Sequence, residues 1–201
     1  MQIETFIIGD IQTNCYIVYD ETDLEGFVID PGDESNCILN FIEKKGLNIK
    51  YIFLTHGHYD HTSVISSIAN KLNCPVYLHK DDLDIYNMQA PIIKSISGEN
   101  LYTSFIFYSE NSEYKINKNL SVKIIFTPGH SKGCVCIELK NHNILFTGDT
   151  MFYGTYGRTD LPGGSEKQMF ESLRKLISNF GGYRIYPGHG QSSNIDFEKE
   201  N

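Results

Sequence analysis

The spacing of apolar and polar positions predicts short strands in the first third of the chain. Three runs of β-branched and aromatic residues, each bounded by Gly, Asn or Asp, have the composition of strands, at residues 3–8, 15–19 and 27–30. A helix is expected at about residues 35–45, because isoleucines recur on one face and Gly46 ends the pattern.

Further along, short apolar strands run directly into polar loops. The apolar run 51–54 continues into Thr55-His56-Gly57-His58-Tyr59-Asp60-His61. Three later strands lead into loops that contain His130, Asp149 and His189, and we expect these strands at residues 122–126, 144–146 and 184–186. If the strands lie side by side, their ends meet at one edge of a sheet. Such an edge is where a rigid scaffold builds a site from residues distant in sequence.

The remaining segments alternate between strands and helices. Strands are expected at residues 74–78 and 135–139, the second in a hairpin with 144–146, and helices at about 64–72 and 166–178. Ser165 and Gln168 form a capping box before the last helix. The pattern predicts one short helix and a loop in residues 79–100, and two strands in residues 101–120.

Length and composition favour a single globular domain over residues 1–201. The chain has 201 residues and a net charge of −8, and domains average ~150 residues. An acidic chain without a basic block disfavours nucleic acid as a partner, and no apolar run reaches the ~18 residues that span a membrane. The odd number of cysteines and the lack of a CxxC pair disfavour a disulfide scaffold, so we expect a cytoplasmic location. Nothing in the sequence indicates an oligomeric state.

Four potential ligands within six residues indicate a metal site. His56, His58, Asp60 and His61 form the pattern His-x-His-x-Asp-His. In a tight loop the first two side chains point to one side and the last two to the other. This arrangement suits two divalent ions, which lie ~3.5–4 Å apart in two-metal hydrolytic sites. The later loops supply the other ligands, and a carboxylate among them is able to bridge two cations.

Neighbouring polar residues have simpler explanations available. Asp30, in Asp30-Pro31-Gly32, has two explanations. It is either part of an ordinary turn, or its carboxylate holds the second ring nitrogen of a histidine that binds metal. The two histidines outside the four loops, His79 and His142, are expected to be solvated rather than to bind metal.

Four motifs occur in order along nearly the whole chain: Thr-His-Gly-His-Tyr-Asp-His at 55–61, Pro-Gly-His at 128–130, Thr-Gly-Asp-Thr at 147–150 and Pro-Gly-His-Gly at 187–190. Together they resemble the metallo-β-lactamase superfamily. The resemblance implies an α/β fold, a four-layer αββα sandwich of two mixed sheets with metals at one edge. It also implies one metal held by His56, His58 and His130, a second held by Asp60, His61 and His189, and Asp149 as their bridge.

The segment after Asp149 points to one branch of this superfamily. Gly157-Arg158-Thr159-Asp160, followed by Leu161-Pro162-Gly163-Gly164-Ser165, resembles the short glyoxalase II-like thioester hydrolases. In that branch a basic residue nine positions after the bridging Asp contacts the glutathione carboxylate, so the resemblance makes Arg158 a substrate-binding residue. An ion pair with Asp160 is the alternative. The C-terminal helical domain that completes the glutathione site of glyoxalase II is not expected here.

The resemblance implies a metal-dependent thioester hydrolase of the hydroxyacylglutathione hydrolase type. Two ions, zinc with iron or manganese as alternatives, would hold a bridging hydroxide that attacks a small-molecule thioester, with Asp60 and Asp149 as the catalytic carboxylates. Use of glutathione is left open, because Gln191 replaces a tyrosine of that branch. A mononuclear-iron persulfide dioxygenase using His56, His130 and Asp149 is the alternative. The net charge of −8 disfavours an RNA-processing nuclease of the same superfamily.

Overall fold

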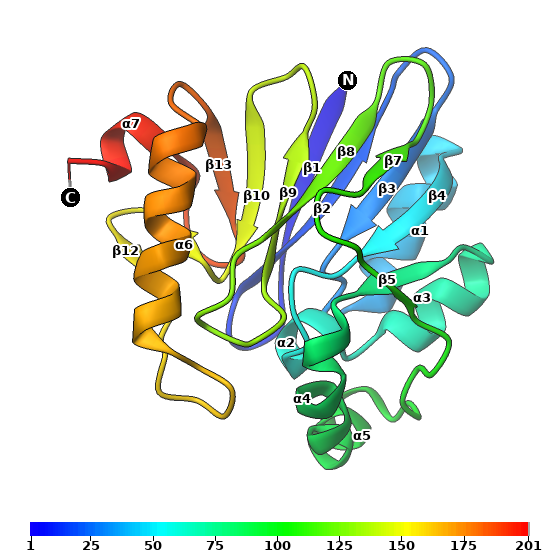
Figure 1. The fold of residues 1–201 in the computed structure, drawn as a ribbon. Helices are drawn as coiled ribbons and strands as arrows, with labels where there is room; N and C mark the ends of the chain where they lie inside the picture. The colour runs from blue at the N-terminus through cyan, green and yellow to red at the C-terminus, as the bar shows by residue number, and fades with distance from the viewer. Residues whose placement is uncertain (201) are drawn as a thin grey trace.

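Two six-stranded sheets pack face to face, with helices on both outer surfaces (Figure 1). The structure, a computed structural model, describes residues 1–200. The first sheet has the order β1 (Gln2–Ile8), β2 (Thr13–Tyr19), β3 (Glu25–Ile29), β4 (Asn48–Phe53), β5 (Val76–Leu78) and β6 (Ile106–Phe107). The second has the order β14 (Ser193–Asn194), β13 (Arg184–Pro187), β10 (Ile144–Gly148), β9 (Val135–Leu139), β8 (Ser121–Phe126) and β7 (Glu113–Lys115).

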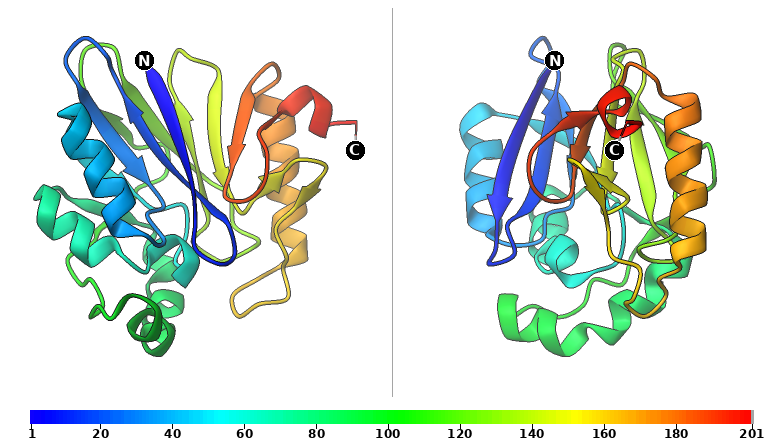
Figure 2. Two further views of the ribbon diagram at one scale, coloured as in Figure 1. Left: turned by 180° about the vertical axis from the view of Figure 1, so that it is seen from behind. Right: turned by 90° about the vertical axis from the view of Figure 1, so that its left-hand side faces the viewer.

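Helices form the two outer layers, as the end-on view in Figure 2 shows. Helices α1 (Ser35–Lys45) and α3 (Ile65–Leu72) cover the first sheet, and α6 (Glu166–Asn179) covers the second. The shorter elements are α2 (Tyr59–Thr62), a 3-10 turn (Lys80–Asp82), α4 (Leu83–Met88), α5 (Ala90–Ser97), the hairpin of β11 (Met151–Phe152) and β12 (Thr155–Tyr156), and α7 (Ile195–Glu198). The predicted α/β class and four-layer αββα sandwich are confirmed.

Apolar side chains fill the three spaces between the four layers. In β2, Cys15 and Ile17 face the helices, whereas Tyr16 and Val18 face the second sheet, because successive side chains of a strand point to opposite faces. A strand buried on both faces has few polar positions, which explains the continuous apolar runs in the sequence. On the other side of the second sheet, Leu176 of α6 closes the third core.

The direction of the strands brings four loops to one edge of the sandwich. Strands β3, β4 and β5 run parallel in the first sheet, and β10 and β13 in the second. Strand β8 shares the direction of β10, since both pair antiparallel with β9. The loops that follow β4, β8, β10 and β13 therefore gather at the edge where α2 lies in Figure 1. The carboxyl ends of strands are where open α/β sheets bind ligands.

Most predicted elements are present, and the main departure lies in residues 79–100. The single short helix expected there is wrong, because the stretch holds a 3-10 turn and two helices. Pro91 in the first turn of α5 starts the second helix with a fixed backbone angle. The two strands expected in 101–120 are present as β6 and β7. Just after β6, the hydroxyl of Tyr108 hydrogen-bonds to the amide and the carbonyl of Leu54, each at 3.1 Å, and so supports the end of β4.

No helix within residues 1–200 has the length and apolarity needed to cross a bilayer.

Candidate metal centre

Five histidines and two aspartates converge at the edge where the strands end. The segment after β4, including α2, supplies four of them, and the loops after β8, β10 and β13 supply one each. All seven are residues that the sequence predicts as ligands. Their candidate ligand atoms form three groups, each with all its atoms within 4.8 Å of one another: His56, His58 and His130; His56, His61 and Asp149; and Asp60, His61 and His189.

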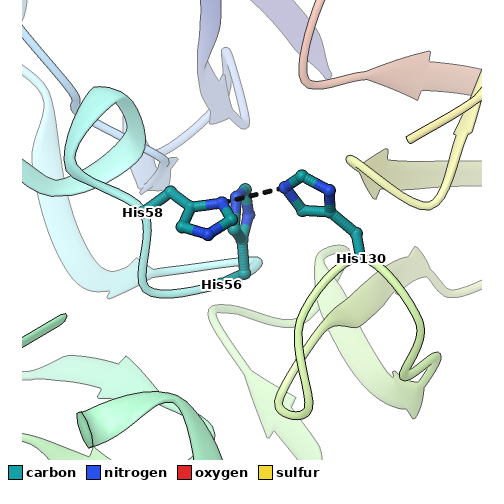
Figure 3. A group of neighbouring side chains, drawn as sticks. All are labelled: His56, His58 and His130. Atoms are coloured by element: carbon teal, nitrogen blue, oxygen red, sulfur yellow. Dashed lines mark hydrogen bonds between the residues drawn. The ribbon is translucent and has the colours of Figure 1, made fainter. Parts of the chain in front are cut away.

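In the first group three imidazoles face one another (Figure 3). Nδ1 of His58 lies 2.8 Å from Nε2 of His130, and the ring of His56 stands nearly perpendicular to both. Burial and the neighbouring histidines lower the pKa of His56 well below its ordinary value, and the same causes lower the pKa of His58 to about 4. Both rings are therefore neutral at pH 7, which is the form in which an imidazole nitrogen binds a metal.

A buried carboxylate fixes the ring of His61. Asp30 accepts hydrogen bonds from the backbone amide of Thr55 at 2.7 Å and from its hydroxyl at 2.6 Å. Its Oδ2 also lies 2.9 Å from Nδ1 of His61. With Nδ1 held in this way, Nε2 of His61 is directed into the centre. Of the two explanations for Asp30, the structure therefore shows the contact with a candidate ligand histidine.

Backbone carbonyls orient two further rings. Nδ1 of His130 lies 2.7 Å from the carbonyl oxygen of Arg158, and Nδ1 of His189 lies 3.1 Å from that of Ile11. A carbonyl can only accept, so each Nδ1 carries the proton and each Nε2 keeps its lone pair. Both Nε2 atoms lie within 4 Å of a carboxylate oxygen of the cluster.

Within the described residues, three buried side-chain atoms have no hydrogen-bond partner, and all three belong to this cluster. They are Nε2 of His56, Nε2 of His61 and Oδ1 of Asp149. Each unpaired buried acceptor costs ~1–3 kcal/mol, and cations at the centre of the cluster would satisfy all three. Imidazole nitrogens and carboxylate oxygens are ligands that zinc, iron and manganese accept. The residues present therefore fit a divalent metal centre.

Asp149 is in contact with histidines of all three groups. Its Oδ1 lies 3.4 Å from Nε2 of His61, and its Oδ2 lies 3.4 Å from Nε2 of His130 and 3.7 Å from Nε2 of His189. Burial alone would raise the pKa of Asp149, but its electrostatic interaction with the neighbouring His61 lowers it. The second carboxylate, Asp60, lies 3.2 Å from Nε2 of both His61 and His189. Asp149 thus has the central position that a bridge between two cations requires.

The last ligand loop is held by β2, from the other end of the sequence. The side-chain amide of Asn14 donates to the carbonyl of Pro187 at 3.0 Å, and the hydroxyl of Tyr16 donates to the same oxygen at 2.6 Å. Gly188 has no room for a side chain, since a Cβ atom there would lie 2.3 Å from Oδ1 of Asp149. The loop therefore approaches the cluster through a backbone contact that glycine alone permits.

Asp82, which sequence analysis missed, connects two ligand loops. The residue is completely buried. Its Oδ2 accepts from the amide of Gly57 at 2.8 Å and from the hydroxyl of Ser131 at 2.7 Å, and its Oδ1 accepts from the amide of Gly133 at 2.6 Å. Burial raises its pKa, whereas these hydrogen bonds act in the opposite direction. Because Gly57 lies inside the His-x-His segment and Ser131 follows the next ligand, Asp82 sets the spacing of the first histidine group.

The sequence offers a signal for one of these supporting residues but not for the other. Asn14 follows Thr13 at the start of an otherwise apolar strand, and a polar pair in that position could have been recognised as buried. Asp82 follows two charged residues, Lys80 and Asp81, which are not buried. Its neighbours therefore give no indication that this one carboxylate is inside.

A cavity of about 600 Å³ lies over the centre, and Arg158 lines it. The guanidinium of Arg158 forms two hydrogen bonds of 2.7 Å with the carboxylate of Asp160. This ion pair raises the pKa of Arg158 and lowers that of Asp160 to about 2. Arg158 thus forms the ion pair with Asp160 that was the alternative to substrate binding. The same side chain also borders the cavity.

Known proteins resemble this chain in both sequence and fold. The family described as the metallo-beta-lactamase superfamily matches residues 8–189. The chain is 30% identical to the probable metallo-hydrolase YqgX of Bacillus subtilis, over 96% of this chain and 92% of that protein. It is 28% identical to the hydroxyacylglutathione hydrolase GloC of Haemophilus influenzae, over 99% of this chain and 95% of that protein. The crystal structure of TTHA1623 in a di-iron-bound form aligns with a TM-score of 0.86 and 31% identity, covering 98% and 96% of the two chains.

The substitution Asp149→Asn is expected to abolish stable binding of two metal ions. Two dications a few ångströms apart repel one another, and a neutral amide does not offset that repulsion as a carboxylate does. Metal content per chain, measured by mass spectrometry after dialysis, should fall below two ions. The exposed Asp196→Asn is the control and should match the wild type. Two retained ions in Asp149→Asn would show that Asp149 is not the bridge.

The substitution Asp82→Asn is expected to weaken metal binding by about 10–100-fold, which is typical when a residue supporting the ligands is changed. The amide keeps the shape of the side chain, but its NH2 group replaces one acceptor oxygen. That NH2 group would face the N–H or O–H groups that now donate to Asp82. Equilibrium competition with a chromophoric chelator measures the affinity, and circular dichroism checks the fold. Asp84→Asn, an exposed aspartate of α4, is the matched control. Equal affinities in the two variants would contradict the role given to Asp82.

Proposed function

The chain belongs to the metallo-beta-lactamase superfamily of metal-dependent hydrolases, and we propose that it hydrolyses thioesters with a dinuclear metal centre. The observation that carries this proposal is the pair of separate three-residue clusters with Asp149 between them. A protein that uses one ion has no need of the second cluster. The 28% identity to a hydroxyacylglutathione hydrolase along nearly the full length of both chains supports thioesters as the substrate class.

We assign the ligands by the groups in which their atoms meet. His56, His58 and His130 would hold the first ion, and Asp60, His61 and His189 the second. Asp149 would lie between the two. Zinc is the proposed metal, with iron and manganese as alternatives that the same nitrogen and oxygen ligands accept. A cytoplasmic location stays a prediction from the cysteine pattern.

Two divalent ions bound here would supply Lewis acidity and lower the pKa of a bound water to ~7. The protein's part is to fix the surroundings of that water. Asp60 accepts a hydrogen bond from the hydroxyl of Thr13 at 3.0 Å, which directs its carboxylate toward the centre and lets it orient the attacking water. The carbonyls and carboxylate behind His61, His130 and His189 hold the rings still, so little reorganisation is needed during the reaction.

A mononuclear-iron persulfide dioxygenase is the competing function. It would use His56, His130 and Asp149, a two-histidine, one-carboxylate set that leaves positions open for oxygen. The TTHA1623 structure, 31% identical to this chain, favours iron as the metal, although it holds two irons rather than one. In the dioxygenase, Asp60, His61 and His189 would have no ligand role. The second cluster is therefore where the two functions make different predictions.

The substitution His61→Ala separates these functions. In the hydrolase it removes a ligand of the second ion, so metal content should fall from two ions per chain toward one. Thioester hydrolysis should fall by at least about a hundredfold, which corresponds to ~2.7 kcal/mol of activation free energy. Metal analysis and the rate with S-lactoylglutathione are the two measurements. The solvated His142→Ala is the control and should change neither.

The opposite result would have a distinct form. A wild-type protein with one iron per chain, and a His61→Ala variant that keeps this iron and consumes oxygen with glutathione persulfide, would exclude the hydrolase and support the dioxygenase.

The substitution Arg158→Ala is expected to raise KM for an anionic thioester more than it lowers kcat. A guanidinium that binds a remote carboxylate contributes equally to the ground state and the transition state. The ion pair with Asp160 adds a second arm to the test: Asp160→Asn frees the guanidinium and should lower KM for the same substrate. Arg174→Ala, an exposed arginine of α6, is the control. A fall in kcat at constant KM would contradict a substrate-binding role for Arg158.

A further inference from the structure

One wall of the cavity leaves large apolar side chains uncovered beside the metal centre. Ile85 and Met88 of α4, Ile92 of α5 and Ile11 of the β1–β2 turn line this wall, which we call the apolar wall. Met88 is 68% exposed, Ile11 48% and Ile92 37%. Exposed apolar side chains that gather in a cavity mark a binding surface rather than ordinary protein exterior.

The polar side chain within this wall is already engaged. Gln89 stands between Met88 and Ile92 in the sequence and lines the same cavity. Its Oε1 accepts from the amide of Tyr59 at 2.6 Å, and its Nε2 donates to the carbonyl of Ile85 at 3.3 Å. The amide therefore holds the wall to α2 and has little capacity left for a polar group of a ligand. A ligand lying on this wall meets mainly hydrocarbon.

One cationic side chain lines the same cavity. Figure 1 shows α4 and α5 below the ligand loops and the segment that follows β12 beside them, and this segment reaches α4 where Gly163 lies next to Ile85. Among the described residues that line the cavity, Arg158 of that segment is the one cationic side chain, and it lies close in sequence to Leu161 and Pro162. The cavity thus offers a substrate at the metal centre one cationic side chain and one apolar wall.

We propose that the apolar wall binds the acyl chain of the substrate, and that the preferred acyl group is an unbranched hydrocarbon chain rather than a short hydroxyacyl group. This inference rests on the proposed thioester hydrolysis. The reaction adds water across the C–S bond: the acyl carbon gains the oxygen to give a carboxylate, the sulfur leaves with one proton of the water as a thiol, and the other proton is released to solvent. A hydrocarbon chain gains affinity by covering Met88 and Ile92, and the flexible methionine adapts to chains of different length.

The selectivity has a magnitude that can be measured. Full burial of one methylene improves binding by about fourfold, and in this open cavity we expect at least a twofold rise in kcat/KM per methylene. The probes are N-acetylcysteamine thioesters of acetate, butanoate, hexanoate and octanoate, so the thiol stays constant. The wild type should prefer the longer chains, and it should hydrolyse hexanoyl-N-acetylcysteamine faster than lactoyl-N-acetylcysteamine. A flat series, or a preference for the lactoyl ester, would overturn the inference.

Substitutions in the wall test whether it causes the preference. Ile92→Gln should lower kcat/KM for the octanoyl ester more than for the acetyl ester, which flattens the chain-length series. Ile106→Gln is the matched control, because Ile106 has a similar exposure of 45% but lies in β6, outside the cavity. If Ile92→Gln does not fold, Met88→Gln replaces it, since Met88 is the most exposed residue of the wall. An unchanged series in the wall variant would overturn the assignment.

A binding measurement keeps this inference separate from the proposed function. Calorimetry of the metal-loaded protein should show octanoate binding more tightly than acetate, with a negative heat-capacity change that reports burial of apolar surface. Both differences should disappear in Met88→Gln. If the wild type hydrolyses no thioester but shows this pattern, the proposed reaction is wrong and the apolar binding site stands. If it hydrolyses thioesters but binds octanoate and acetate equally, the reaction stands and the apolar acyl site is wrong.

Discussion

The structure depends on one electrostatic constraint. Seven electron-rich side chains meet at one place, and their lone pairs need positive charge between them. Five imidazoles and two carboxylates direct lone pairs into a shared space, and three of these atoms find no hydrogen-bond partner within the described residues. Protein groups alone do not balance such a cluster, because protonating some of the rings would set like charges against each other in a poorly solvated space. Divalent ions at this centre would provide the balance. The supporting contacts of Asp30, Asp82 and the backbone carbonyls keep the lone pairs directed at the middle of the cluster.

The sandwich meets this requirement because its two sheets end their strands at a common edge. Each ligand loop leaves a buried strand, so its first residues are fixed by a ladder of hydrogen bonds and by core packing on both faces. Rigid elements hold a site more closely than mobile loops do. The cavity above the centre is built differently, from short helices and from the segment around Arg158. In the proposed enzyme the candidate metal ligands are therefore held by the sandwich, whereas the cavity wall that would contact the substrate belongs to segments attached to its edge.

The sequence predicted those features whose residues lie close together along the chain, and it missed features whose residues meet only in the fold. The His-x-His-x-Asp-His segment could be recognised because its ligands lie within six residues after an apolar run, and the Gly46 helix end because its chemistry is equally local. Asp82 could not, since its partners are 25 to 51 residues away and become neighbours only in the fold. The second helix of residues 79–100 was missed because the two helices have only 6 and 8 residues, which is shorter than the stretch over which a helical period can be recognised with certainty. For Arg158, the resemblance implied substrate binding and left an ion pair with Asp160 open; the structure shows the ion pair and places the side chain at the cavity, and substrate binding stays a prediction.

The hydrogen bonds between β2 and the last ligand loop have a consequence for the order in which the protein assembles. They join residues 173 and 171 positions apart, and contacts across so long a chain segment form late because closing the loop between them costs conformational entropy. On a ribosome, His56, His58 and His130 emerge well before His189 does. The nascent chain can thus complete the first ligand group while the second is still missing its final member. In the proposed dinuclear centre, the second ion would therefore bind only after the last ligand loop has docked against β2.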